Sequence, residues 1–180
     1  MYQGYHRIFW GLIFITFHIN LGSLQILPGF VGCLVIVSGA GLLVGQHSSE
    51  LFRKTLITAW FLAFISLCLS LTGWMHYQSL WLSFFPVAFA AGEFAFCYYL
   101  LEGGRQQLIE AGEEAMASEL EGQVFTLLMI YVIFIILECI GIALNHQSML
   151  IMVAIFGLLP RILVMAKLRK LMNVQPSEVE

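Results

Sequence analysis

Four ionisable residues lie within or at the edge of otherwise apolar runs of the sequence, at His18, Glu93, Glu138 and Arg161. An ionisable side chain inside a long apolar segment is costly, so it usually has a partner and often has a role. Carboxyl groups and imidazoles in such positions serve proton relays, and an arginine can bind a carboxylate. These four residues therefore form the candidate polar site of the protein.

The spacing of the four residues suggests two pairs. Glu93 and Arg161 follow polar bends at nearly equal distances along the chain, and a helical rise of about 1.5 Å per residue puts both roughly 20 Å from those bends. They can pair if their two helices are neighbours. Glu138 lies roughly 10 Å from the next bend. His18, in the outer part of the first apolar run, is therefore its natural partner.

Each pair has a structural reading beside the functional one. Glu93 and Arg161 can form a salt bridge that only clamps two helices, or an ion- or proton-coupled site. Glu138 can be a protonated carboxyl bonded to a neighbouring helix. His18 can be satisfied by Asn20, Gln25 or water, and on a helix His18 and Gln25 would share a face.

The composition requires lipid as the main solvent of the surface. Of the 180 residues 60% are hydrophobic and only 11% are charged, whereas soluble domains average about 25% charged residues. No cleavable signal peptide is expected, because the first apolar run leads straight into a second one. The eight basic residues are spread too widely for a nucleic-acid interface.

The apolar runs predict an all-α polytopic membrane bundle of six transmembrane helices, arranged as three hairpins in one domain over residues 1–170. A span needs about 20 apolar residues. The expected spans cover 8–27, 28–45, 55–72, 80–101, 124–144 and 149–166, with a cytoplasmic acidic connection at 102–122 and a cytoplasmic tail at 171–180. Within the acidic connection, apolar residues at helical spacing suggest a separate short amphipathic helix.

The basic residues predict the orientation. Six spans put seven of them on one side of the membrane, whereas the other three bends contain none. Lys and Arg mark the cytoplasmic side, so both termini should be cytoplasmic. The seven are Arg7, Arg53, Lys54, Arg105, Lys167, Arg169 and Lys170.

Small residues and cysteines suggest packing rather than chemistry. Ser38, Gly41 and Gly45 form a ridge that would let another helix approach closely. Each of the four cysteines lies in a different apolar run, and we read them as small buried side chains. Neither a metal site nor a cofactor is expected, because the spacing of metal ligands is absent.

The first hairpin resembles a known group of proteins. Residues 14–32 read FITFHINLGSLQILPGFVG, with an Asn-x-Gly bend followed by Pro-Gly, which favours a tight turn. This stretch resembles the opening of small multi-span membrane proteins of Gram-positive bacteria that have no assigned role. The resemblance implies a location in the bacterial plasma membrane and no particular activity.

Two functions remain open at this point. Motifs such as H-E-x-x-H, G-x-S-x-G and the P-loop do not occur, so an enzyme is not expected. The favoured interpretation is a non-catalytic accessory or regulatory membrane subunit. Besides the lipid bilayer, its partner would be another protein or a second copy, bound through the acidic connection or the Ser38, Gly41 and Gly45 ridge. The alternative is a transport or binding protein for a small solute or ion, which uses His18, Glu93, Glu138 and Arg161.

Overall fold

The chain is described by a computed structural model over residues 2–16, 20–21, 24–25, 29–74, 84–144 and 155–172. These residues form six helices, so the predicted all-helical class is confirmed. The helices are α1 (Tyr2–Thr16), α2 (Gly29–Gln46), α3 (Glu50–Trp74), α4 (Phe84–Glu110), α5 (Glu114–Leu144) and α7 (Leu158–Met172). Two short strands, β1 (Asn20–Leu21) and β2 (Leu24–Gln25), lie between α1 and α2.

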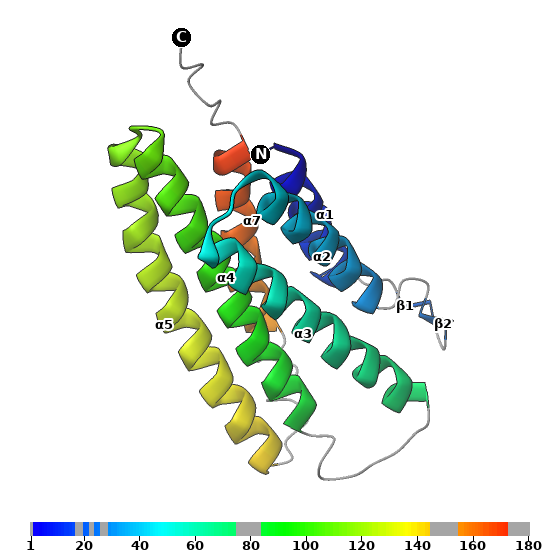
Figure 1. Cartoon of the computed structure of the whole chain (residues 1–180). Helices are drawn as coiled ribbons and strands as arrows, with labels where there is room; N and C mark the ends of the chain where they lie inside the picture. Colours follow the sequence, from blue (N-terminus) through cyan, green and yellow to red (C-terminus); the bar gives the residue numbers. More distant parts are fainter. Residues whose placement is uncertain are drawn as a thin grey trace.

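The helices pack as a single bundle in which neighbours in sequence are neighbours in space. Each helix from α1 to α5 packs against the next one, and α7 contacts both α1 and α5 (Figure 1). The start of α1 and the end of α7 meet at one end of α4. A Cβ atom on Gly104 would lie 2.8 Å from Leu171 and 3.4 Å from the Tyr5 hydroxyl. We call this end of the bundle the polar end.

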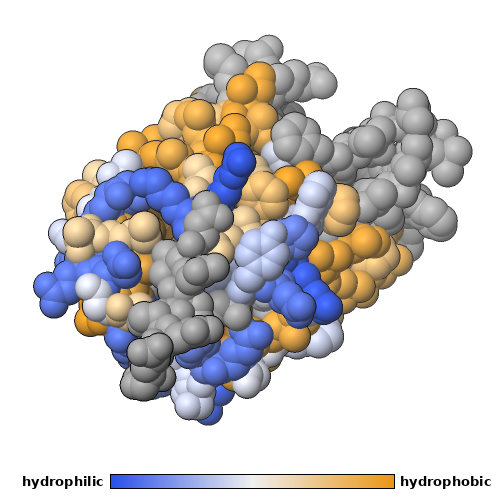
Figure 2. Space-filling view, turned by 90° about the horizontal axis from the view of Figure 1, so that it is seen from above, coloured by the Kyte–Doolittle hydropathy of each residue, from blue (hydrophilic) through white to orange (hydrophobic). Residues whose placement is uncertain are grey.

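Four helices are long and apolar enough to cross a membrane. They are α2, α3 up to Leu71, α4 and α5. Hydrophilic residues gather at the polar end, whereas hydrophobic residues cover much of the flanks (Figure 2). The flanks of α3 and α5 are strongly apolar, with exposed side chains at Ile57, Trp60, Phe61, Phe64, Leu67, Leu71, Phe125, Met129, Val132, Ile133, Ile136, Ile140 and Leu144. Such a surface fits lipid rather than water, which is consistent with a membrane protein.

The closest helix contact lies between α1 and α2 and depends on glycines seven residues apart. A Cβ atom on Gly11 would lie 2.8 Å from the Gly32 carbonyl oxygen, and one on Gly39 would lie 2.7 Å from the Gly4 carbonyl oxygen. The two helices run in opposite directions, so each pair of glycines brings two backbones together. Small residues at a helix interface permit this approach.

The predicted packing ridge lies elsewhere on α2. A Cβ atom on Gly41 or Gly45 would meet no atom within 4 Å. Ser38 is exposed and its hydroxyl accepts a hydrogen bond from Arg7 at 2.5 Å. Within the described residues, α1 therefore packs on the Gly32 and Gly39 face of α2 and not on the Ser38, Gly41 and Gly45 ridge.

The first helix is shorter than predicted at its far end. The expected span continued to residue 27, but α1 ends at Thr16, and Asn20 pairs with Gln25 in the antiparallel contact of β1 with β2. Asn, Gly and Ser favour turns over helix because their backbones and side chains offer alternative hydrogen bonds. The prediction that Gln25 shares a helical face with His18 is therefore wrong.

The acidic connection is part of two long helices. The expected separate helix within 102–122 is wrong, because α4 continues to Glu110 and α5 begins at Glu114. Gly112 has a φ of 79°. The Gly112 amide donates to Ile109 and the Glu113 amide donates to Leu108, at 3.0 and 2.9 Å. This is the Schellman arrangement that ends a helix at a glycine, so the turn needs only three residues.

The remaining helices agree with the predicted spans to different degrees. The second span, 28–45, lies within one residue of α2, and the third, 55–72, lies inside α3. The sixth span was expected at 149–166, whereas α7 extends to Met172, and residues 149–154 lie outside the described part.

Candidate intramembrane site

Glu93 of α4 and Arg161 of α7 form a bidentate ion pair inside the bundle. The Arg161 Nε–H donates to one carboxylate oxygen of Glu93 at 2.6 Å, and an Nη2–H donates to the other at 2.9 Å. The Glu93 side chain is 5% exposed and that of Arg161 is 19% exposed. Parallel N–H···O bonds of this kind are strong and fix the orientation of both groups. The structure thus joins the two residues that the sequence placed at equal depth.

The pair joins the first half of α4 to the first turn of α7. Glu93 lies about 13 Å along α4 from its start at Phe84. Arg161 lies in the first turn of α7, directly after Pro160, a residue type that suits the beginning of a helix. The bidentate contact thus ties the first half of α4 to the beginning of α7.

A buried polar contact lies one helical turn from Glu93. The Cys97 sulfur and the Tyr131 hydroxyl are 3.6 Å apart, and both side chains are almost fully buried. The Tyr131 ring also packs against Phe94, with ring centroids 5.6 Å apart. These contacts fasten α5 to the part of α4 that carries Glu93, and they extend the polar cluster from α7 to α5.

A cavity of about 220 Å³ borders Arg161. Its other walls come from the end of α1, the start of α2, the middle of α3 and the beginning of α4. It is lined by Ile15, Gly29, Ser66, Leu69, Ser70, Phe89 and Arg161. The cavity thus brings a guanidinium group and two hydroxyl-bearing residues together against otherwise apolar walls.

Glu138 lies on α5 near the pair but does not join it by a hydrogen bond. Its Oε2 atom is buried and has no hydrogen-bond partner within the described part of the chain. The predicted partner, His18, lies outside the described residues. Of the four predicted site residues, the structure therefore brings two into direct contact and places Glu138 on a neighbouring helix.

Sequence reasoning missed several residues of this cluster. Ser66 and Ser70 are four residues apart in the apolar run of α3 and so share one face, a signal that was present in the sequence. The sequence alone does not show whether a serine in an apolar helix lines a cavity or only packs against another helix. Tyr131 gave no such signal, because its contact with Cys97 depends on how α4 and α5 meet.

The cysteines fit the predicted structural role only in part. Cys33 and Cys97 are buried, Cys68 is partly buried, and Cys139 is exposed on the outside of α5. Among the described residues, His, Cys, Asp and Glu side chains form no group of three that could hold a metal ion.

Comparisons of this chain with protein-family models, with curated proteins and with solved structures gave no match.

Proposed function

We propose that the protein binds and moves a small polar solute or ion at the cavity beside Arg161. The observation that carries this proposal is that the buried Glu93–Arg161 pair borders a cavity. If the ion pair only held two helices together, we would expect close packing around it on every side, since charges in apolar surroundings need full compensation. Here the guanidinium group lines a space of about 220 Å³ together with Ser66 and Ser70.

The chemistry of the cavity favours a solute with acceptor oxygens. A guanidinium group carries further N–H donors beyond the two that Glu93 accepts. The Ser70 hydroxyl donates to the Ser66 carbonyl oxygen at 2.9 Å and so offers a solute its acceptor lone pairs, whereas the Ser66 hydroxyl can donate or accept. Glu138 is the natural carrier of an accompanying proton, because one of its oxygens is buried without a partner within the described residues.

The same proposal includes the full topology. We infer six spans with both termini on the cytoplasmic side of a bacterial plasma membrane. Arg7, Tyr5 and the end of α7 belong to the polar end, where Lys167 and Lys170 approach Glu119 at 3.6 and 2.7 Å. Gathering basic residues at one end supports this orientation by the positive-inside rule.

Purification in lipid nanodiscs followed by mass spectrometry tests the proposal. We expect the wild-type protein to retain a small polar molecule in near-stoichiometric amount. A variant with Ser66→Ala and Ser70→Ala should fold, keep the ion pair and lose that molecule. Ser38→Ala is the matched control, because Ser38 lies on the exposed face of α2 away from the cavity. Equal retention by both variants, or none by the wild type, would contradict the proposal.

A second candidate function is a non-catalytic accessory or regulatory subunit. The observation that favours it is the unoccupied face of α2, where Gly41 and Gly45 have open space around them. Exposed Glu113 and Glu114 at the turn between α4 and α5 offer a separate surface for a basic partner. The partner in this case is another protein or a second copy of the chain.

The nanodisc experiment also addresses this second candidate. A protein that copurifies in fixed ratio, and that is lost from Gly41→Leu or from Glu113→Gln with Glu114→Gln, would support the accessory role. Retention of that protein by all of these variants would exclude both surfaces. Gly112 is kept in every variant so that the turn itself is unchanged.

A further inference from the structure

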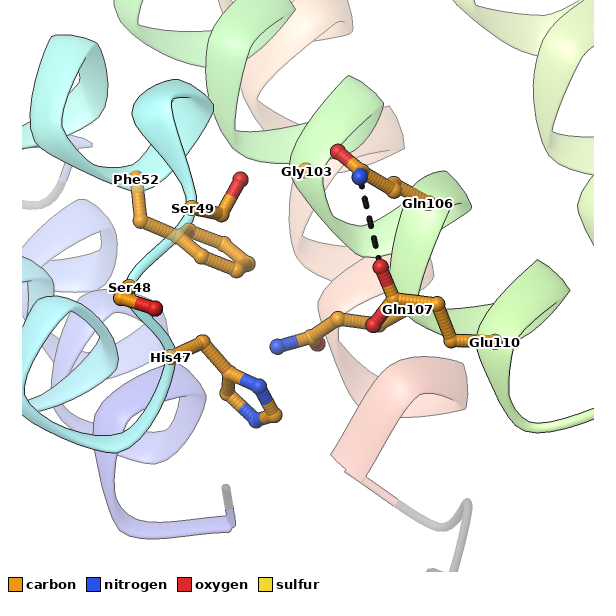
Figure 3. Close-up of a pocket in the computed structure, with 8 residues that line it drawn as sticks. All are labelled: His47, Ser48, Ser49, Phe52, Gly103, Gln106, Gln107 and Glu110. Carbon is orange, nitrogen blue, oxygen red and sulfur yellow. Dashed lines mark hydrogen bonds between the residues drawn. The ribbon is translucent and has the colours of Figure 1, made fainter.

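A second cavity, of about 240 Å³, lies at the polar end between the α2–α3 connection and the last turns of α4. Figure 3 shows its walls. One side is made by His47, Ser48, Ser49 and Phe52, and the other by Gly103, Gln106, Gln107 and Glu110. We call it the polar-end pocket. At about 30 Å³ per water molecule it has room for roughly eight waters, which is the size of a small polar molecule.

Close packing forms the floor of the pocket. Phe52 is 1% exposed, and a Cβ atom on Gly103 would lie 2.8 Å from its ring. The absence of a side chain at Gly103 therefore lets the ring lie directly against α4. Next to it, the His47 and Phe52 rings are 6.2 Å apart. The floor of the pocket is thus rigid, while its walls are polar.

Gln107 aims a hydrogen-bond donor into this pocket. Its Oε1 atom accepts a hydrogen bond from the buried Tyr5 hydroxyl at 2.8 Å. That bond orients the amide so that Nε2 points toward the side where His47 lies (Figure 3). The Nε2 atom is buried and has no partner within the described residues. A buried donor without an acceptor is costly, so an acceptor oxygen is expected from a bound molecule.

Glu110 supplies the complementary group. It is the one acidic residue among the described residues that line the pocket, and Gln106 donates to one of its oxygens at 3.3 Å. That hydrogen bond holds the carboxylate at the rim and leaves its other oxygen for a ligand. A carboxylate at the rim favours a cation. An ammonium group with N–H donors can form a charge-assisted hydrogen bond to this carboxylate, which is stronger than a hydrogen bond between neutral groups.

We propose that the polar-end pocket binds an ethanolamine-type group, in which a primary ammonium contacts Glu110 and a nearby oxygen accepts the hydrogen bond of Gln107. Such a group is carried both by free amino alcohols and by phosphatidylethanolamine headgroups. The pocket lies at an end of the bundle, where either source can reach it. This site is separate from the cavity at Arg161 and does not depend on the function proposed for that cavity.

Thermal unfolding of the full chain, followed by tryptophan fluorescence, tests this proposal. The protein is placed in nanodiscs whose lipid is phosphatidylcholine, a lipid without a primary amine, and ethanolamine is titrated in an amine-free buffer. We expect a saturable rise of the unfolding midpoint with ethanolamine, and little rise with choline or ethylene glycol. Glu110→Gln should weaken the apparent affinity about tenfold, because a charge-assisted contact becomes a neutral one.

Glu113→Gln is the matched control, since Glu113 is also exposed but does not line the pocket. It should respond to ethanolamine like the wild type. No rise with ethanolamine, an equal rise with choline, or an unchanged affinity in Glu110→Gln would each overturn the proposal and leave a pocket that holds water only. Nanodiscs with phosphatidylethanolamine identify the source. Loss of the ethanolamine effect there assigns the site to the lipid headgroup, and its persistence assigns it to a free amine.

Discussion

Two Arg–Glu pairs of similar geometry lie in two different regions of the molecule. In the middle of the bundle, Arg161 reaches Glu93 on another helix with a shortest N–O distance of 2.6 Å. At the polar end, Arg105 reaches Glu102 on its own helix, also at 2.6 Å. The first pair connects residues far apart in sequence and is mostly buried, whereas the second connects residues three apart and is partly exposed. The two pairs therefore share the same N–O distance, but their contributions to the stability of the fold should differ greatly.

The largest expected effect comes from removing one partner of the buried pair. Glu93→Gln should destabilise the fold by about 3–5 kcal/mol, because Arg161 would keep its charge in apolar surroundings without compensation. The measurement is SDS-induced unfolding in mixed micelles. A loss no larger than that of a polar-end pair would contradict the difference between the two regions.

Replacing both partners separates stability from function. Glu93→Leu with Arg161→Met should recover most of the lost stability, because a packed apolar pair often replaces a buried ion pair without loss. The same double variant should no longer retain the small molecule expected at the cavity. A double variant that is stable and still retains the molecule would show that Arg161 does not take part in binding.

Two glycines, Gly11 at a helix contact and Gly41 in open space, allow the same comparison for helix packing. Gly11→Ala puts a Cβ atom 2.8 Å from the Gly32 carbonyl oxygen and should cost about 1–3 kcal/mol, because two backbones must move apart. Gly41→Ala is the matched control, since a Cβ atom there meets nothing within 4 Å. It should leave stability unchanged or raise it by up to about 1 kcal/mol. Equal effects of the two substitutions would show that α1 and α2 are not in such close contact.

The same two regions show what sequence reasoning could and could not find. Glu93 and Arg161 were found because charges stand out in apolar runs and the helical rise converts spacing into depth. The face of α2 that α1 covers was not identified, because G-x-x-x-G at Gly41 and Gly45 is only one of several small-residue patterns on that helix. The correct signal was a shared spacing of seven, in Gly4 and Gly11 on one helix and in Gly32 and Gly39 on the other.

Both cavities escaped prediction for a different physical reason. The cavity at Arg161 is lined by residues of five helices, and the polar-end pocket by residues of the α2–α3 connection, α3 and α4. A cavity depends on what neighbouring side chains fail to fill, which no single segment encodes. By contrast, the helical class and the four long apolar helices follow from composition and run length alone.

A smaller effect is expected at the exposed pair of the polar end. Arg105→Gln should cost less than about 1 kcal/mol, because its pairs with Glu102 and, at 3.5 Å, with Glu121 of α5 are partly solvated and gain little over hydration. Mixed-micelle unfolding at low and at high salt is the measurement. The small loss should shrink further in high salt, while the loss caused by Glu93→Gln should not, since buried charges are screened much less. A salt-independent loss at Arg105 would show that this pair is more buried than its exposure indicates.

The smallest effect is expected at Glu119, in the second turn of α5. With 31 residues, this helix is about 46 Å long and exceeds the roughly 30 Å hydrocarbon layer. Its first turns carry Glu114, Glu119 and Glu121, so we place these turns outside the layer. The Lys170 ammonium donates a hydrogen bond to the Glu119 carboxylate and Gln123 donates another, which lowers the pKa of Glu119 to about 2.

A lowered pKa of Glu119 in the folded state means that the stabilisation is present above the ordinary pKa of 4.5 and is lost as the pH falls toward 2. Glu119→Gln should therefore be slightly less stable than the wild type at pH 7, and the difference should vanish near pH 2. A Glu119→Gln difference that persists at pH 2 would mean that the carboxylate contributes through packing rather than through its charge.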